Sequence, residues 1–270
     1  MRFAELFEQH FDELTLLESL DMGAPLHTRL RPARNGAVQN ILYFAAQARN
    51  INGDTTPNSL PGSVTSMILK APVGVVGGII PWNGPIFGQF NVLGPALATG
   101  CTVVLKPAED ASLAVLRTAE LLLEAGLPPG VVNVVTGLGS EAGAALASHP
   151  DVNRVAFTGS TVTGREIIKA SAVNMKRIQL ELGGKSPDIV FADADLDKAV
   201  PGVAMGVFNN SGQICFAGTR VFVQRSIQDE FVERFGRRLL RRADRVWQCE
   251  QHHDHRPRGD LRAGGLGHTL

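Results

Sequence analysis

The stretch Val73–Ile80 (VGVVGGII) decides the fold. It is a continuous apolar run without a charged side chain, and Pro81 follows it at once. An apolar run of this length is typical of a central parallel strand, because both faces of such a strand are buried. Val73–Ile80 therefore predicts the middle strand of a parallel sheet, with a turn at its carboxyl end.

Strands and helices alternate on the C-terminal side of this stretch. Further strands are expected at residues 102–105, 131–135 and 154–157. The helices expected between and after them cover residues 87–99, 112–125, 141–147 and 162–171. This alternation predicts an α/β fold with a doubly wound parallel sheet.

The flanking segments have other patterns. Before the sheet, apolar periodicity predicts helices at residues 2–20 and 37–51, a loop at 55–62 and a strand at 64–69. After residue 175 we expect strands at 176–180, 188–191 and 219–224 and helices at 195–209 and 228–240. We place a domain boundary near Met175.

Composition narrows the possible functions. The 270 residues include 26 basic and 26 acidic side chains, so the charge favours neither nucleic acid nor an anionic membrane as a partner. The most apolar run is too short to cross a bilayer, which needs about 20 residues. Three cysteines do not form a disulfide framework, so we expect a reducing, cytoplasmic setting.

Two residues that could take part in catalysis lie after the boundary. Glu181 begins the motif Glu-Leu-Gly-Gly-Lys, and Cys215 ends the motif Gly-Gln-Ile-Cys. A glutamate can act as a general base, and a cysteine thiolate can act as a nucleophile. Taken singly, Glu181 is also readable as a surface acid and Cys215 as a small core residue. The combination of the two favours a catalytic pair.

The paired motifs resemble the signature of the NAD(P)-dependent aldehyde dehydrogenase superfamily. Three upstream segments agree with it: Pro-Trp-Asn-Gly-Pro from Pro81, Lys-Pro-Ala-Glu from Lys106, and Phe-Thr-Gly-Ser from Phe157. The resemblance covers roughly residues 2–241. It implies a Rossmann-like NAD domain within residues 1–175 and the first part of an α/β catalytic domain at 176–241.

The resemblance implies oxidation of a small-molecule aldehyde to a carboxylic acid. Cys215 would attack the aldehyde and pass through a hemithioacetal and a thioester. Asn83 would stabilise the oxyanion, and Glu181 would activate the hydrolytic water. The alternative is a truncated, catalytically inactive fragment that at most binds dinucleotide.

The resemblance also implies a cofactor site. Lys106 and Glu109 match the contacts to the adenosine ribose, and a carboxylate there favours NAD, with NADP possible. The other cofactor-binding candidates are Ile80, Pro81, Trp82, Gly139, Phe157, Gly159, Ser160 and Leu182. Gly159 and Ser160 begin a helix, whose free N–H groups suit a pyrophosphate.

The last residues differ in composition. Residues 242–270 lack apolar periodicity and contain four of the seven histidines, so we expect an aberrant, disordered tail. We expect no metal site, because the histidines at 252, 253 and 255 lack a fourth ligand at ordinary spacing. The family forms homo-oligomers, but its C-terminal pairing segment has no counterpart here.

Overall fold

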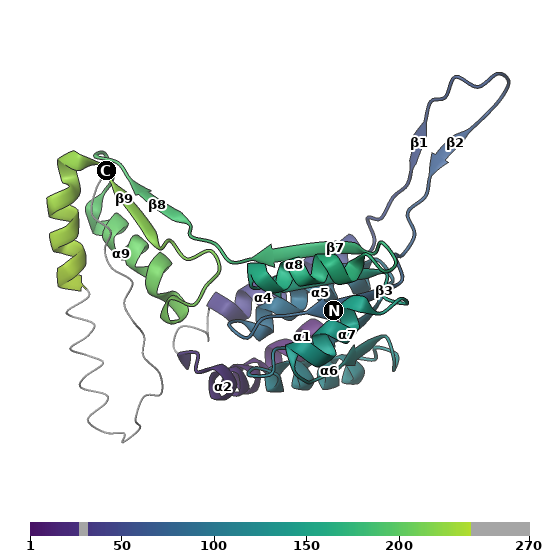
Figure 1. Ribbon diagram of the computed structural model, residues 1–270, viewed down its shortest axis with the longest axis horizontal. Helices are drawn as coiled ribbons and strands as arrows, with labels where there is room; N and C mark the ends of the chain where they lie inside the picture. Colours follow the sequence, from purple (N-terminus) through teal and green to yellow (C-terminus); the bar gives the residue numbers. More distant parts are fainter. Residues whose placement is uncertain (27–31, 239–270) are drawn as a thin grey trace. The chain divides into compact units, whose positions relative to one another are not determined.

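The structure is a computed structural model that describes residues 1–26 and 32–238 (Figure 1). The chain divides into two compact units. The first contains Met1–Ser186 and Val207–Thr219, and the second contains Pro187–Gly206 and the chain from Arg220. The tail expected at 242–270 lies outside the described residues.

A five-stranded sheet forms the centre of the first unit. Its strands are β3 (Val75–Ile79), β4 (Thr102–Lys106), β5 (Val132–Val134), β6 (Arg154–Gly159) and β7 (Arg177–Leu182). Their order is β5-β4-β3-β6-β7, and all four neighbouring pairs are parallel. The predicted α/β fold with a parallel sheet is confirmed, and β3 is its middle strand.

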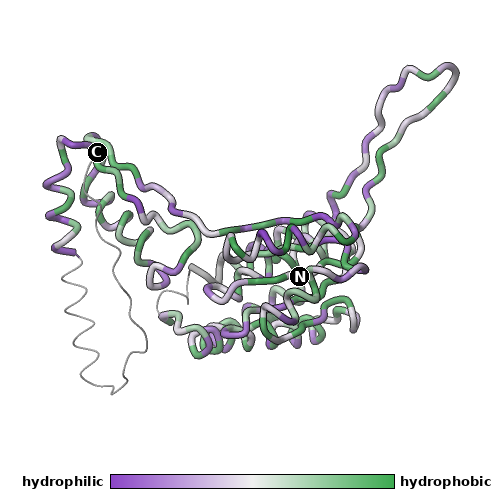
Figure 2. The backbone as a smooth tube through the Cα atoms, viewed as in Figure 1, coloured by the Kyte–Doolittle hydropathy of each residue, from purple (hydrophilic) through white to green (hydrophobic). Residues whose placement is uncertain are grey.

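Helices cover both faces of this sheet. They are α5 (Pro85–Ala98), α6 (Leu113–Glu124), α7 (Ala144–Ser148) and α8 (Thr161–Ser171), and a π-helical turn η1 (Gly139–Gly143) leads into α7. One core joins β3 and β4 to α5 and α6, and another joins β3 and β6 to α7 and α8. Figure 2 shows hydrophobic and hydrophilic residues alternating along these helices, as expected when only one helix face is buried.

Two adjacent glycines let the helices approach β3 from both sides. A β-carbon at Gly77 would lie 3.0 Å from Leu146 Cγ on α7, and one at Gly78 would lie 2.8 Å from Val92 Cγ1 on α5. Successive strand residues point to opposite faces, so each glycine makes room on one face. The glycines in the predicted central strand are therefore a packing requirement.

An outer layer of N-terminal helices packs on α5 and α6. It consists of α1 (Arg2–Gln9), α2 (Phe11–Met22) and α4 (Pro32–Gln47). The single helix predicted at 2–20 is interrupted at His10, and the helix predicted at 37–51 begins earlier and ends earlier. The phenylalanines at 7 and 11 are buried in this layer, where Phe7 meets Phe90 edge-on at a centroid distance of 5.0 Å.

Carboxylates of α2 hold the first residues of α5 and α6. Buried Glu18 accepts a hydrogen bond from Ile86 N at 3.4 Å, and Asp21 accepts one from Leu113 N at 2.8 Å. Negative side chains are favourable at helix N-termini, where backbone N–H groups lack helical partners. These contacts fix the outer layer against the helices that cover the sheet.

A short hairpin differs from the prediction. Strand β1 (Asp54–Thr56) pairs antiparallel with β2 (Ser66–Ile68), whereas we expected only the second strand and a loop beginning at residue 55. The paired segment is three residues long and mostly exposed, so it lacks the alternating pattern from which a strand is predicted.

The second unit is a smaller α/β element. Its strands β8 (Pro187–Val190) and β9 (Arg220–Val223) are parallel, and α9 (Leu196–Phe208) follows β8 in the chain. A 3-10 turn (Arg225–Ile227) precedes a helix that is described from residue 228 to 238. The predicted strands and helices of this region are present, with described ends that differ by at most one residue; the helix end predicted at residue 240 lies outside the described residues.

The predicted boundary at residue 175 stays a prediction. Strand β7 pairs with β6 over six residues, so residues 177–182 belong to the same sheet as the strands before them. Within the described part of the chain, no helix combines the length and the apolar character needed to cross a membrane.

We expect Phe7→Ala to destabilise the first unit by about 3–5 kcal/mol, because it opens a cavity between α1 and α5. Leu20→Ala is the matched control, since Leu20 is 72% exposed on α2. Urea unfolding of both variants measures the difference. Equal losses of stability would show that the outer layer does not depend on its buried aromatic core.

Candidate functional site

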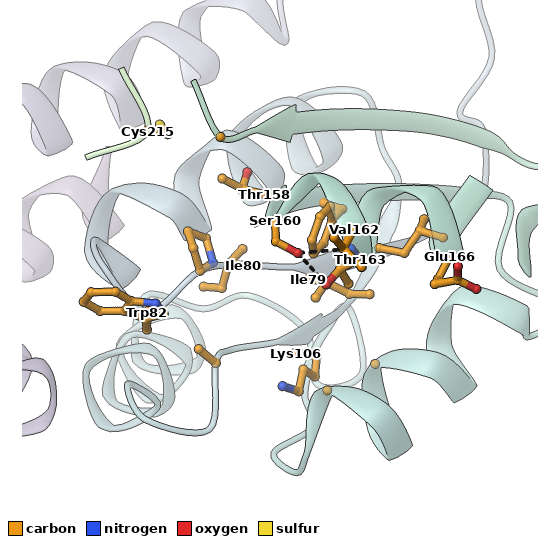
Figure 3. A pocket seen from close by; sticks show the side chains of 18 of the residues that line it. Ile79, Ile80, Trp82, Lys106, Thr158, Ser160, Val162, Thr163, Glu166 and Cys215 are labelled. Carbon is orange, nitrogen blue, oxygen red and sulfur yellow. Dashed lines mark hydrogen bonds between the residues drawn. The ribbon is translucent and has the colours of Figure 1, made fainter. Parts of the chain in front are cut away.

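A cavity of about 1140 Å³ lies at the carboxyl ends of the sheet strands in the first unit (Figure 3). In the sheet register, Ile79 at the end of β3 pairs with Lys106 on β4 and with Phe157 on β6, and all three residues line the cavity. The chain proceeds from β3 to β4 and β5, and then returns to β6 on the other side of β3. Ligands of open α/β sheets bind at such a change of direction.

Most residues predicted from the sequence line this cavity. They are Ile80, Pro81, Trp82, Asn83, Lys106, Glu109, Gly139, Phe157, Gly159, Ser160 and Cys215. They come from five separate segments of the chain. Figure 3 shows Cys215 and Glu166 on opposite sides of the view, with Trp82 below Cys215 and Lys106 low in the centre.

Two predicted residues, Glu181 and Leu182, are not among those that line the cavity. Both lie at the end of β7, where successive side chains point to opposite faces. Leu182 packs into the core beneath α8, where a β-carbon at Gly164 would lie 2.8 Å from its Cδ2 atom. Glu181 is exposed, and the residues that follow it, Gly183–Lys185, do line the cavity.

An ion pair forms one wall of the cavity. Lys106 Nζ donates to Glu109 Oε2 at 2.9 Å, and the side chain of Lys106 is 3% exposed. Gly139 N donates to the other carboxylate oxygen at 3.5 Å. The hydrogen bond from Lys106 holds the pKa of Glu109 below its usual range, with smaller contributions from backbone N–H groups. Three predicted cofactor residues are therefore in contact.

The first turn of α8 forms another wall. Ser160 caps this helix, and its Oγ accepts a hydrogen bond from Thr163 N at 3.0 Å. The first N–H groups of a helix have no helical partner, and the helix dipole makes this end favourable for an anion. The segment that leads into the helix, Phe157–Ser160, lines the cavity.

Cys215 follows a left-handed turn. The φ angles of Asn210, Ser211 and Gly212 are 50°, 58° and 74°. Left-handed backbone costs a non-glycine residue roughly 1–2 kcal/mol, so Asn210 and Ser211 need compensation from their surroundings. Cys215 is exposed, whereas Cys101 is buried in the core.

Two asparagines supply that compensation. Asn83 Nδ2 donates to Gln213 O at 2.7 Å, and Asn210 Nδ2 donates to Asn83 O at 3.0 Å. Asn210 is 5% exposed, so its side-chain amide is largely shielded from water, whereas the contact from Asn83 to Gln213 is exposed. They connect the turn after β3 to a residue two positions before Cys215.

A close backbone contact fixes the other side of this loop. A β-carbon at Gly184 would lie 3.0 Å from the carbonyl oxygen of Cys215. A side chain at this position would require the Cys215 carbonyl to move by a few tenths of an ångström, so glycine suits this close approach. Gly184 and Cys215 are thus neighbours in space, although they are 31 positions apart in the chain.

Sequence reasoning missed several parts of the site. Asn210 was not singled out, although its place in Asn-Asn-Ser-Gly is a turn signal. The walls made by η1, α7 and α8 were also missed, because residues spread along helix faces form no distinctive sequence motif. They include Ser140, Ala144, Ala147, Val162, Thr163 and Glu166. Within residues 1–26 and 32–238, no group of three or more potential ligand side chains could hold a metal ion.

The chain is similar in sequence to known proteins. Residues 1–245 match the description "Aldehyde dehydrogenase family". The chain is 47% identical over 249 residues to the NADP/NAD-dependent aldehyde dehydrogenase PuuC of Escherichia coli, covering 92% of this chain and 49% of that protein. It is 50% identical over 234 residues to the mitochondrial aldehyde dehydrogenase of Homo sapiens, covering 86% and 45%.

Solved structures are also similar to this chain. The NAD+ complex of aldehyde dehydrogenase from Bacillus cereus matches with a TM-score of 0.84 and 48% identity, over 87% of this chain and 47% of that one. PnpE in complex with nicotinamide adenine dinucleotide matches with a TM-score of 0.81 and 46% identity, over 87% and 48%. The chain spans about half the length of the curated relatives it matches. Because the family match covers nearly the whole sequence and includes the cavity residues, the chain belongs to the aldehyde dehydrogenase family.

Proposed function

We propose that this chain oxidises an aldehyde to a carboxylic acid with NAD, using Cys215 as the nucleophile. One observation carries the proposal. A single cavity is lined both by the Lys106–Glu109 pair and by the exposed Cys215. A dinucleotide site and a reactive thiol that share one hollow are what a hydride transfer from a thiol-bound substrate requires.

The residues of the cavity fit NAD chemically. The Glu109 carboxylate would accept hydrogen bonds from the adenosine ribose hydroxyls, and Lys106 would donate to them. The N-terminus of α8 would hold the pyrophosphate. Pro81, Trp82 and Phe157 offer apolar surface to the rings. When bound, NAD supplies the hydride acceptor.

The Cys215 thiolate would form a bond to the aldehyde carbon and give a hemithioacetal. The negative charge that develops on the oxygen needs fixed hydrogen-bond donors. Asn83 is the proposed side-chain donor, and its contact with Gln213 O places its amide beside the cysteine loop. Loss of hydride from the carbon then leaves a thioester on Cys215.

Glu181 is the proposed base for hydrolysis of that thioester. Its carboxylate would take a proton from water, the resulting oxygen would bond to the acyl carbon, and the Cys215 sulfur would leave. Its proposed role rests on the resemblance and on its position immediately before Leu182 and the cavity-lining Gly183.

The two chemical roles predict different kinetics. With a panel of aldehydes, we expect Cys215→Ala to abolish both the first burst and the steady release of NADH. Glu181→Gln should keep a burst of one equivalent while steady turnover falls about 100-fold or more, the size of a general-base contribution. Rapid-mixing absorbance records both phases.

Cys101→Ala is the control, because it removes a buried thiol away from the cavity. Turnover that survives in Cys215→Ala would overturn the proposed nucleophile. Absence of turnover in the natural chain, together with NAD binding, would instead favour the alternative of an inactive dinucleotide-binding chain. Absence of both would remove the cofactor assignment.

We expect Glu109→Gln to change cofactor choice. Hydrogen bonds to charged groups contribute about 1.5–3 kcal/mol, so NAD affinity should fall about tenfold or more. NADP affinity should fall less, because the negative charge that repels a 2′-phosphate is gone. Titration with both cofactors gives the ratio, and Glu120→Gln on α6 is a charge-matched control. An unchanged ratio would contradict the role of Glu109.

The same variant predicts a pH effect on stability. The folded-state pKa of Glu109 is lowered from its ordinary value of 4.5 by Lys106, so folding favours the carboxylate. Its contribution to stability is complete above the unfolded pKa and is lost as the pH falls through the lowered pKa. The unfolding free energy of the natural chain minus that of Glu109→Gln should therefore be constant above about pH 4.5 and shrink below it.

Gly184→Ala tests the contact between the Gly-Gly pair and the cysteine loop. The added β-carbon should displace the Cys215 carbonyl, and a shift of about 1 Å at a catalytic group can reduce the rate about 100-fold. We expect a changed rate of Cys215 alkylation by iodoacetamide as well as lower turnover.

Gly183→Ala is the comparison for that experiment. A β-carbon at Gly183 would have no described atom beyond its chain neighbours within 4 Å. Its effect on alkylation should be smaller. Equal alkylation rates in the two variants would show that the close approach of Gly184 does not position the nucleophile.

The cytoplasmic setting and the homo-oligomeric state stay predictions. Size-exclusion chromatography with light scattering measures the second. The proposal concerns the reaction and its residues and depends on neither.

A further inference from the structure

The turn between α8 and β7 holds the end of α7 through side-chain hydrogen bonds. Lys176 Nζ donates to Ala147 O at 2.8 Å and to His149 O at 2.7 Å. Asn174 Nδ2 donates to Pro150 O at 2.6 Å and to Val152 O at 3.0 Å. Residues 174–176 thus bind four carbonyl groups at the end of α7 and in the loop that follows it. We call residues 174–176 the α7 clamp.

The backbone of the clamp is in an unusual conformation. Met175 has φ 52°, and its side chain is 90% exposed. A left-handed conformation costs roughly 1–2 kcal/mol at a residue with a side chain, and exposure of Met175 returns nothing through packing. The conformation is therefore maintained by its neighbours, whose side chains bind the same loop from either side of Met175.

Burial of the charged Lys176 side chain is unfavourable by itself. Its exposed fraction is 7%, and burial lowers the pKa of its ammonium group below the usual range. Lysine is rarely buried without strong partners, and an ammonium group has three donors for them. The final carbonyls of a helix have no helical partner and carry partial negative charge, so a cation there is favourable.

Helix α7 needs such support because it is short. It has five residues, and its core contacts come from Leu146 and Ala147. With η1 it forms a cavity wall through Gly139, Ser140, Gly143, Ala144, Ala147 and Ser148. Gly139 at the start of this wall is the residue that donates to Glu109. A displacement of α7 would therefore alter the part of the cavity next to the proposed ribose site.

We propose that the α7 clamp is a positioning element for the adenosine half of the cofactor site. It fixes α7, and through α7 the wall against which the adenosine half of NAD binds. The clamp immediately precedes β7 in the chain, so it connects that wall to the strand that carries Glu181. The identity of the ligand rests on the proposed function, whereas the fixing of α7 does not.

The first measurement, hydrogen exchange, needs no ligand. In Lys176→Met the side chain stays unbranched and apolar along its length, is one atom shorter and loses its donors. Hydrogen exchange of residues 139–148 should become about tenfold faster or more, which corresponds to ~1.4 kcal/mol. Exchange in β3 and β4 should be unchanged. Lys176→Arg, which keeps a cation with several donors, should restore protection.

Binding of the two halves of NAD, ADP-ribose and nicotinamide mononucleotide, then distinguishes a positioning role from a general loss of stability. Lys176→Met and Asn174→Leu should each lower the affinity for NAD and for ADP-ribose about tenfold. The affinity for nicotinamide mononucleotide should change less than about twofold. Lys198→Met and Asn133→Ala are matched controls, since each removes an exposed side-chain donor elsewhere. Lys176→Arg should recover most of the lost affinity.

Each other result counts against the clamp. Unchanged exchange at 139–148 would overturn the fixing of α7, and equal loss for both halves of the dinucleotide would overturn its role in the adenosine site. If the natural chain binds neither NAD nor ADP-ribose, the proposed function and the cofactor role fail together. The exchange data then decide separately whether the clamp holds α7.

Discussion

The central strand β3 hydrogen-bonds to a parallel neighbour on each side, and the site depends on that pairing. A buried strand must satisfy its backbone donors and acceptors within the sheet, because neither face offers water. The pairing places the ends of β3, β4 and β6 in register, so Ile79, Lys106 and Phe157 meet at one edge. The cavity lies there because the chain continues from β3 to β4 on one side of the sheet and later returns to β6 on the other side.

The cysteine side of the site is built by a different means. It contains little regular structure, and its conformation is maintained by polar contacts and one close backbone approach. Left-handed backbone at Asn210 and Ser211 is unfavourable by itself, so the loop holds this shape only with its partners present. Strain of this kind is common at functional sites, where surrounding structure determines the position of a reactive group.

The sheet and the cysteine loop both require glycine, but for different reasons. In β3, Gly77 and Gly78 allow helices to pack on both faces, which is a requirement of the fold. At residue 184, the absence of a side chain allows the backbone to approach Cys215, which is a requirement of the site. Residues with the same chemistry thus serve stability in one segment and geometry in the other. The α7 clamp is an intermediate case, because a buried cation and an amide hold a short helix that apolar contacts alone hold weakly.

The sequence by itself determined the α/β class and the central strand, and most of the site residues that it predicted line the cavity. Continuous apolar runs separated by amphipathic helices specify a parallel sheet, and a sheet edge gathers whatever follows its strands. The break at His10 and the hairpin at 54–56 could not be predicted, because helix kinks and short exposed strands leave no periodic signal. The same holds for the walls of α7 and α8.

Only the tertiary structure decided how the motifs meet. It brought Gly184 against Cys215 and Asn83 against Gln213, across separations of 31 and 130 residues. It also placed Leu182 in the core and Glu181 outside the cavity lining, although both belong to one motif. The physical reason is that a motif records which residues occur together in the chain, whereas side-chain direction is set by strand alternation and by the helices that pack on each face.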